Sequence, residues 1–204
     1  MTSRAQDLRP GAIRERILDA AEACLVESGY SSRLHAVIAE RAGLSRPTVY
    51  KYVGDQSDIF EALLQREITR FFAVLDPVLH ARGDVRSGFV DCVVFAVGYA
   101  RRHAVLQKGL RDHPALVLPW FSVAAGPLID RGAEFLVPHF ERMLAGSPGT
   151  GIGARAAGEW AFRVVASLIT TRGAVDTGDE RALREFVHGL LSIGGVPASE
   201  TQSV

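Results

Sequence analysis

The sequence predicts an all-α fold. Apolar residues repeat at helical spacing along most of the chain, and no segment shows the strict apolar–polar alternation of a half-buried strand. Glycines and prolines fall between the periodic segments, where helices are expected to end. The chain has 204 residues, of which 48% are hydrophobic and 23% charged, so it can bury a core and does not have the composition of a disordered protein.

The first predicted helix lies close to the N-terminus and ends at Gly29. Its apolar stripe consists of Ile13, Ile17, Ala20, Ala21, Cys24 and Leu25. The residues from Met1 to Pro10 are polar and lack the apolar core of a signal peptide. No run of about 18 apolar residues is without a charge, which argues against a membrane span. We therefore expect a cytoplasmic protein.

Two short helices should follow, joined by a tight turn. The apolar side chains of the second helix are Leu34, Ile38 and Ala42, and its candidate N-caps are Ser31 and Ser32. Gly43 should end it. The third helix should begin after Ser45, a favourable N-cap, with Pro47 in its first turn, where a missing N–H costs little. Gly54 should end this helix.

A long fourth helix is predicted from Asp55 or Ser57 to about Leu75, where Asp76 and Pro77 should break it. Further helices are expected at residues 89–102, 104–112, 116–144, 154–171 and 179–192, which gives about nine in all. Kinks or breaks are expected in the longest of these at Pro119, Pro127 and Pro138. A Gly-rich loop should occupy residues 146–153, and the tail after residue 194 should be frayed.

The first three helices have the order and spacing of a helix-turn-helix. If Val49 and Val53 anchor the third helix, the side chains left facing outward are Arg46, Pro47, Thr48, Tyr50 and Lys51. Arginine can donate two hydrogen bonds to guanine, and the hydroxyls and the lysine can contact base edges or phosphates. Backbone N–H groups at the helix start, near Ser45 and Thr48, also favour a phosphate. This set predicts a surface that fits the major groove of DNA.

Net charge neither supports nor excludes this prediction. Lys and Arg number 23, and Asp and Glu also number 23, so no global field draws the chain to nucleic acid. Residues 29–57 have a mild local excess of positive charge. The acidic residues of this segment are Glu40 and Asp55, and the basic residues are Arg33, Arg41, Arg46 and Lys51. Any DNA-binding surface must therefore be local.

Several runs in this region resemble the DNA-binding domain of the TetR (tetracycline-repressor) family over about residues 10–64. They are Ile17-Leu18-Asp19-Ala20-Ala21, Gly29-Tyr30, Ile38-Ala39-Glu40-Arg41-Ala42-Gly43-Leu44-Ser45 and Thr48-Val49-Tyr50-Lys51-Tyr52. The resemblance implies a homodimeric regulator, mostly a repressor in this family, that binds a pseudo-palindromic operator and responds to a small molecule. It divides the chain into a DNA-binding domain, 1–57, and a ligand-binding and dimerisation domain, 58–204. The residues expected at DNA are Arg33, Ser45, Arg46, Pro47, Thr48, Tyr50, Lys51 and Tyr52.

Three departures from the family pattern favour an alternative. Arg33 and His35 stand where a hydroxyl residue and an apolar residue are usual, Val53 replaces an aromatic residue, and Gln56 replaces a lysine. The alternative is a helical ligand-binding or protein-interaction domain whose degenerate helix-turn-helix no longer binds DNA.

A largely apolar effector cavity is expected between the segments 89–102 and 116–144, with the fourth helix as its moving wall. Small residues beside large aromatic ones, interrupted by prolines, can leave room for a ligand. Few charges fall on these segments, so the effector should be mainly hydrophobic. The candidate ligand-binding residues are Phe71, Phe89, Val93, Ala96, Tyr99, His103, Trp120, Phe121 and Phe135.

The last two helices should form the homodimer interface as a four-helix bundle. The run Glu159–Ser167 resembles the dimerising helix of the family, and both helices carry apolar stripes too large to leave in water. One of them must also pack on its own subunit, so the stripes are expected to be shared between core and interface. The interface residues expected are Ala157, Trp160, Ala161, Val164, Val165, Leu168, Phe186, Val187 and Leu190.

No enzymatic activity, cofactor or metal is predicted. The segment Gly149–Gly153 has no strand before it and no Gly-Lys-Ser/Thr after it, which favours an inter-helix loop over a phosphate-binding one. No two histidines lie three or four residues apart, so a metal site presented by one helix is not expected, and His103 and His139 should be core or boundary residues. Cys24 and Cys92 should be buried free thiols.

Overall fold

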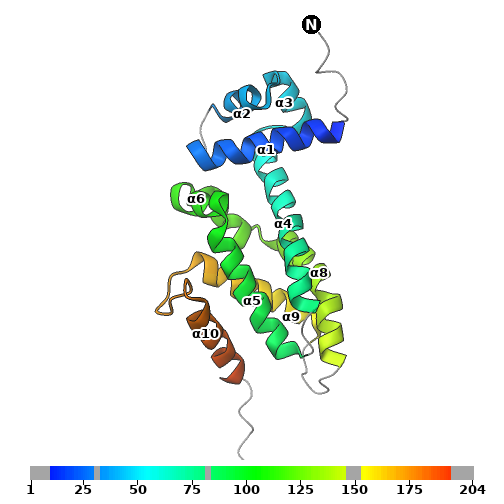
Figure 1. The fold of residues 1–204 in the computed structure, drawn as a ribbon, viewed down its shortest axis with the longest axis vertical. Coiled ribbons are helices and arrows are strands. Elements are labelled where there is room, and N and C mark those ends of the chain that lie inside the picture. The colour runs from blue at the N-terminus through cyan, green and yellow to red at the C-terminus, as the bar shows by residue number, and fades with distance from the viewer. Residues whose placement is uncertain (1–9, 30–32, 81–83, 146–152, 194–204) are drawn as a thin grey trace, which may run out of the picture. The chain divides into compact units, whose positions relative to one another are not determined.

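The computed structural model describes residues 10–29, 33–80, 84–145 and 153–193. Within these ranges every regular element is a helix and none is a strand, which confirms the all-α class (Figure 1). The chain divides into two compact units. Unit 1 comprises residues 1–72 and 103–117, and unit 2 comprises residues 73–102 and 118–204. A functional division at residues 57 and 58 stays a prediction.

Unit 1 is built around its first helix. Its elements are α1 (Pro10–Ser28), α2 (Leu34–Ala42), α3 (Arg46–Val53), the first part of α4 (Gln56–His80), α6 (Ala104–Asp112) and α7 (Pro114–Val117). Helix α1 packs against α2, α3 and α6, because its apolar stripe faces them. The side chains buried most completely in this core are Ile17, Ala21, Leu25, Ile38, Val49 and Ile59. Cys24 is also buried and is a free thiol.

The turn between α2 and α3 has the residues that its geometry requires. Gly43 adopts the left-handed conformation with φ 60°, and its N–H donates to the carbonyls of Ala39 and Glu40. The side chain of Ser45 then accepts a hydrogen bond from the Thr48 N–H and caps α3, as predicted. The expected caps of α2, Ser31 and Ser32, lie outside the described residues.

Unit 2 consists of the rest of α4 together with α5 (Val85–Arg102), a 3-10 helix η1 (Leu118–Phe121), α8 (Gly126–Ala145), α9 (Ala154–Thr170) and α10 (Glu180–Ile193). Helix α9 packs against α8 and α5, and α10 packs against α5. Among the side chains in this core are Leu75, Leu79, Val93, Val97, Ala133, Phe140, Ala161, Leu183 and Val187.

Two prolines lie inside helices that they were expected to interrupt or kink. Helix α4 continues through Pro77 to His80, so the predicted break at this residue is wrong. Leu75 and Leu79 flank Pro77 and are 1% and 0% exposed, so burial of both side chains offsets the backbone hydrogen bond that proline cannot make. Pro138 likewise lies within α8, between the buried residues Leu136 and Phe140.

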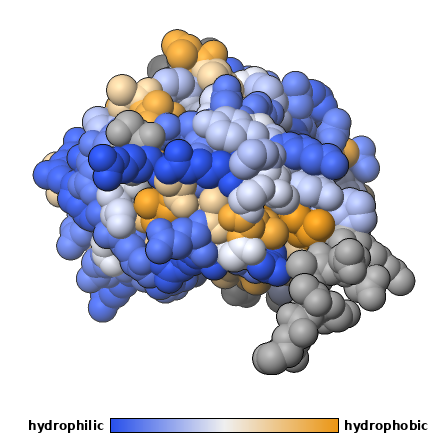
Figure 2. Space-filling model, turned by 90° about the horizontal axis from the view of Figure 1, so that it is seen from above, coloured by the Kyte–Doolittle hydropathy of each residue, from blue (hydrophilic) through white to orange (hydrophobic). Residues whose placement is uncertain are grey.

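The surface seen in Figure 2 is mostly hydrophilic, with hydrophobic side chains gathered in smaller areas. Across the described ranges, no helix combines the length and the apolar character that crossing a membrane requires.

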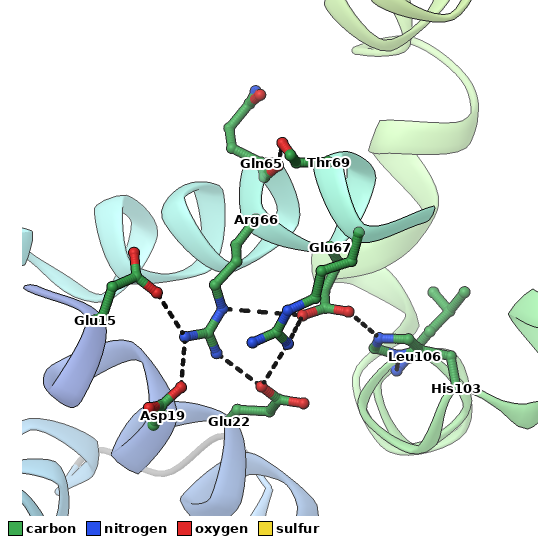
Figure 3. Close-up of polar contacts among 10 residues, drawn as sticks. Glu15, Asp19, Glu22, Gln65, Arg66, Glu67, Thr69, His103 and Leu106 are labelled. Atoms are coloured by element: carbon green, nitrogen blue, oxygen red, sulfur yellow. Dashed lines mark hydrogen bonds and ion pairs between the residues drawn. The ribbon is translucent and has the colours of Figure 1, made fainter. Parts of the chain in front are cut away.

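A network of charged side chains joins α1 to the first part of α4 (Figure 3). The guanidinium of Arg66 lies 3.4, 2.8 and 2.7 Å from carboxylate oxygens of Glu15, Asp19 and Glu22, which follow one another along one face of α1. The Arg66 side chain is only 9% exposed, so water screens its part of the network less than it screens a surface pair.

The network extends from Arg66 to α6. Arg70 contacts Glu22 at 3.2 Å and also pairs with Glu67, and Nε2 of His103 lies 2.9 Å from Oε2 of Glu67. Burial raises the pKa of Glu67, but the hydrogen bond with His103 and the positive charge of Arg70 outweigh it, so the pKa is lowered overall. Glu67 is therefore held in its ionised form.

We expect Arg66→Met to lower the free energy of unfolding by about 2 kcal/mol, because three carboxylates of α1 lose their shared cation. Urea unfolding followed by circular dichroism measures this change. Arg163→Met is the matched control: Arg163 makes an exposed pair with Glu159 one turn away, and its loss should cost about 0.5 kcal/mol or less. Equal effects of the two substitutions would contradict a structural role for the Arg66 network.

Candidate nucleic-acid interface

Helix α3 has one face in the core of unit 1 and one at the surface. Val49 is 0% exposed and Val53 is 3% exposed, so the predicted anchors of α3 are confirmed. The next residues around the helix point outward because a turn holds 3.6 residues. Of the residues expected at DNA, those exposed on or beside α3 are Ser45, Arg46, Pro47, Tyr50 and Lys51, while Thr48 and Tyr52 are half-buried. Arg33 precedes α2 and is exposed.

The N-terminus of α3 presents backbone N–H groups together with two hydroxyls. The Oγ of Ser45 lies 2.8 Å from Oγ1 of Thr48 and accepts from the Thr48 N–H at 3.2 Å. Pro47 has no N–H to offer and fixes the first turn. The positive end of the helix dipole at this position favours an anion.

His35 and Tyr50 connect α2 to the exposed face of α3. Their rings stack with centroids 4.2 Å apart and planes only 4° from parallel. The His35 Nε2 also lies 3.1 Å from the carbonyl oxygen of Gly54, just beyond α3. From the sequence, His35 is only a departure from the family pattern, standing where an apolar residue is usual. The structure shows a role for this histidine, because His35 holds the Tyr50 ring in a fixed orientation while 51% of that residue stays exposed.

Helix α1 fixes the C-terminal ends of α2 and α3 through two arginines. Arg14 donates to the carbonyl of Tyr52 at 2.8 Å, and the Arg16 Nε donates to the carbonyl of Ala42 at 2.7 Å. The Tyr52 ring packs against the core, and the Lys51 ammonium lies 5.7 Å from the centre of that ring. These contacts orient α3 as a rigid element rather than as an isolated short helix.

The start of α4 is closed by reciprocal capping between Asp55 and Asp58. Asp55 accepts from the N–H groups of Ser57 and Asp58 at 2.7 and 3.0 Å, and its own N–H donates to Asp58 at 2.8 Å. Gly54 precedes this turn with φ 74°. A Cβ on Gly54 would lie 2.1 Å from the Asp58 carboxylate, so the turn requires glycine. Gln56, which stands at the usual lysine position, is the first residue of α4.

The candidate ligand-binding residues are divided between the two units. Phe89, Val93 and Ala96 of α5 lie buried in unit 2, and four more of the set are half-buried there: Tyr99, Trp120, Phe121 and Phe135. Phe71 and His103 belong to unit 1. Both ring nitrogens of His103 have protein contacts, with Glu67 and with the Leu106 N–H. Contact between these candidate ligand-binding residues and an effector stays a prediction.

The apolar stripes of α9 and α10 are shared between the core and the surface of unit 2. The stripe residues buried in the chain itself are Ala157, Ala161, Leu183 and Val187. Trp160 stays 40% exposed, although its ring stacks on Phe89 at 4.5 Å, and Leu190 is 42% exposed. The half-buried members are Val164, Val165, Leu168 and Phe186. A role in dimerisation stays a prediction.

Sequence reasoning missed a polar cluster at the end of α4 in unit 2. Asp76 and His80 lie one helical turn apart, and His139 of α8 joins them. Burial lowers the pKa of His139, and the charge of Arg142 adds to this effect while Asp76 opposes it. The signal in the sequence is an aspartate four residues before a histidine, which places both side chains on one face of a helix.

Comparison with known proteins identifies the first part of the chain. Residues 17–63 match the family model described as "Bacterial regulatory proteins, tetR family". An uncharacterized HTH-type transcriptional regulator of Mycobacterium tuberculosis is 29% identical over 188 residues, which cover 87% of this chain and 85% of that protein. A second such regulator, from Mycobacterium bovis, is 42% identical over 102 residues, which cover 50% of this chain and 52% of that protein.

Solved structures show the same fold. The TetR family repressor AlkX from Dietzia sp. has a TM-score of 0.61 and 23% identity, covering 88% of this chain and 95% of its own. The fatty acid degradation regulator FadR from Bacillus halodurans has a TM-score of 0.60 and 22% identity, covering 91% of this chain and 96% of its own. The family model matched over residues 17–63, the helix-turn-helix of unit 1 and the relatives named as HTH-type transcriptional regulators identify the chain as a transcriptional regulator of the TetR family.

Proposed function

We propose that this regulator binds a pseudo-palindromic DNA operator as a homodimer and is released by a mainly hydrophobic small molecule, acting as a repressor in the cytoplasm. The observation that carries the proposal is the division of α3, whose two valines are buried while Arg46, Tyr50 and Lys51 remain exposed. A short helix held by one face and polar on the other is the element that DNA-binding helix-turn-helix proteins place in the major groove.

Each exposed group of α3 has a distinct task at the operator. Arg46 stands in the first turn, where a guanidinium can reach the O6 and N7 of a guanine. The N–H groups beside Ser45 and Thr48 receive a phosphate, with the helix dipole in support. Tyr50 and Lys51 reach the backbone on either side. Because His35 fixes the Tyr50 ring, this contact costs little side-chain entropy.

The stack between His35 and Tyr50 also counts against a degenerate helix-turn-helix. His35 replaces an apolar residue, yet it closes α2 onto α3 through the ring contact and through the carbonyl of Gly54. The anchor at Val53 is buried although it lacks an aromatic ring. The departures at His35 and Val53 are thus accommodated inside unit 1.

The apolar surface of α9 and α10 supports the proposal of a homodimer. Trp160 and Leu190 are among the large hydrophobic side chains that stay exposed in a single chain. Packing α9 and α10 of one subunit against those of another would bury both. A two-fold axis between the subunits would also place two α3 helices on a palindrome.

The effector is expected to be mainly hydrophobic because α5 turns apolar side chains into the interior of unit 2. Val93 and Ala96 are buried on α5, and the aromatic rings of Phe121 and Phe135 are half-buried. An effector that binds here can release DNA only if it prefers the conformation in which α3 does not fit the operator. Helix α4 extends from unit 1 into unit 2 and is the element on which such a preference would act.

For DNA binding, we expect Lys51→Ala to weaken affinity equally for all sequences and to reduce the salt slope, because one phosphate contact is lost. Arg46→Ala should cost about 1–3 kcal/mol on the preferred operator and relax its sequence preference. Fluorescence anisotropy with DNA flanking the protein's own gene measures both. Arg111→Ala, at an exposed position on α6, is the control and should change neither property. Unchanged affinity and slope in both test variants would refute this placement of the recognition helix.

For assembly, we expect light scattering at micromolar concentration to give twice the chain mass of 22.0 kDa. Leu190→Asp should shift the protein toward monomer, because it places a charge on the apolar surface of α10. Val123→Asp is the matched control: Val123 is 94% exposed and lies outside both helices, so the dimer should persist. A monomeric wild-type protein would rule out this interface.

For the effector, we expect a thermal-shift screen to show stabilisation by lipophilic compounds, with aromatic and acyl-chain compounds tested as separate groups. Binding to the native state raises the melting temperature in proportion to the logarithm of ligand concentration over Kd. A set of strongly anionic compounds of similar size serves as the control. Stabilisation by the anions alone would show that the chemistry proposed for the cavity is wrong.

A further inference from the structure

Asp76, His80 and His139 form a cluster in unit 2 that the proposed function does not use. One potential ligand atom of each residue lies within 4.8 Å of the other two. The Asp76 carboxylate lies between the two rings: one oxygen is 3.2 Å from Nδ1 of His80, and the other is 3.2 Å from Nε2 of His139. The rings are edge to face, with centroids 5.0 Å apart.

The backbone holds these groups in place from two helices. Asp76 and His80 share one face of α4 because they are four residues apart, and the buried side chains of Leu75 and Leu79 anchor this end of the helix. His139 comes from α8 and is 4% exposed, with its ring beside that of Phe135 at 5.1 Å. Two ligands on one helix and a third from a packed neighbour are therefore oriented before any ligand arrives.

We propose that Asp76, His80 and His139 bind a divalent transition-metal ion of the zinc type. Two imidazoles and one carboxylate are the donor set that proteins use for such ions when at least one coordination position stays open. Oxygen-preferring ions such as Mg²⁺ are disfavoured by two nitrogen donors. The side chains of Asp76 and His80 are 46% and 51% exposed, so an ion can enter from solvent and water can complete its coordination.

In the metal-free chain, the ring proton of His139 lies where the ion would bind, and Nδ1 of His80 lies 2.9 Å from the main-chain carbonyl of Asp76. Nη2 of Arg142 lies 2.8 Å from Nδ1 of His139, and because arginine only donates, Nδ1 accepts. The ring proton of His139 is therefore on Nε2, where it points to Asp76. When a metal binds Nε2, that ring proton moves to Nδ1 and the exposed Arg142 side chain must turn away. Imidazole ligands of metals commonly donate the other ring N–H to a neighbouring acceptor or water.

The test uses the full chain without an affinity tag, treated with a chelator and then titrated with ZnSO₄ in a calorimeter. We expect one Zn²⁺ per chain, a higher melting temperature with Zn²⁺, and no comparable effect of MgSO₄. His80→Ala and Asp76→Asn should each weaken Zn²⁺ binding at least about tenfold, since loss of even an outer-shell partner costs this much. The His80 side chain is half exposed, so its removal should leave the fold intact.

His188→Ala is the matched control, because His188 is an exposed histidine on α10, outside the cluster. It should keep wild-type affinity. With Co²⁺ as a spectroscopic probe, the visible absorption of the wild-type complex should be lost in His80→Ala and retained in His188→Ala. The proposal is overturned if the wild type binds no stoichiometric Zn²⁺, or if His80→Ala and Asp76→Asn bind it as tightly as the wild type does. None of these measurements involves DNA, so their failure would leave the proposed regulator intact.

Discussion

The ion network around Arg66 is the interaction on which the geometry of unit 1 depends most. One guanidinium binds three carboxylates of α1, and α1 in turn supplies the apolar face and the two arginines that position α2 and α3. The first part of α4 is thus held in place relative to α1 and, through α1, relative to α3. Because one cation serves three partners, ordering one side chain is enough for several contacts, which favours a network over separate pairs.

The first three helices were predictable because their boundaries depend on local chemistry. Gly43 supplies a left-handed conformation, and Ser45 caps the next helix within the same few residues. The helix break predicted at Pro77 was wrong because the end of α4 does not depend on local chemistry alone. A proline rule considers only the lost N–H and a steric clash, whereas the length of α4 is decided by the burial of Leu75 and Leu79 in a core that the sequence alone does not display.

The candidate site likewise has features that the sequence predicts and features that depend on packing between helices. The exposed face of α3 follows from helical periodicity once Val49 and Val53 are buried. The role of His35 was not predictable, because it depends on a ring one helix away and on the carbonyl of Gly54. The cluster at Asp76 shows the limit more clearly: its third member, His139, comes from a distant helix, and only packing in unit 2 brings it to α4.

Some of the charged residues between residues 29 and 57 are engaged in contacts within unit 1. Arg41 contributes to the local excess of base between residues 29 and 57, but its guanidinium makes a two-point pair with Glu27 of α1 at 2.5 and 2.7 Å. Its charge is therefore largely neutralised within unit 1. Asp55, counted as an opposing charge, is engaged in capping α4. Under the proposed function, attraction to phosphate would rest mainly on the exposed side chains of Arg33, Arg46 and Lys51. In a chain of zero net charge, the proposed operator binding would then draw a larger share of its energy from the helix dipole and the hydroxyls at the start of α3 than binding by a strongly basic protein does.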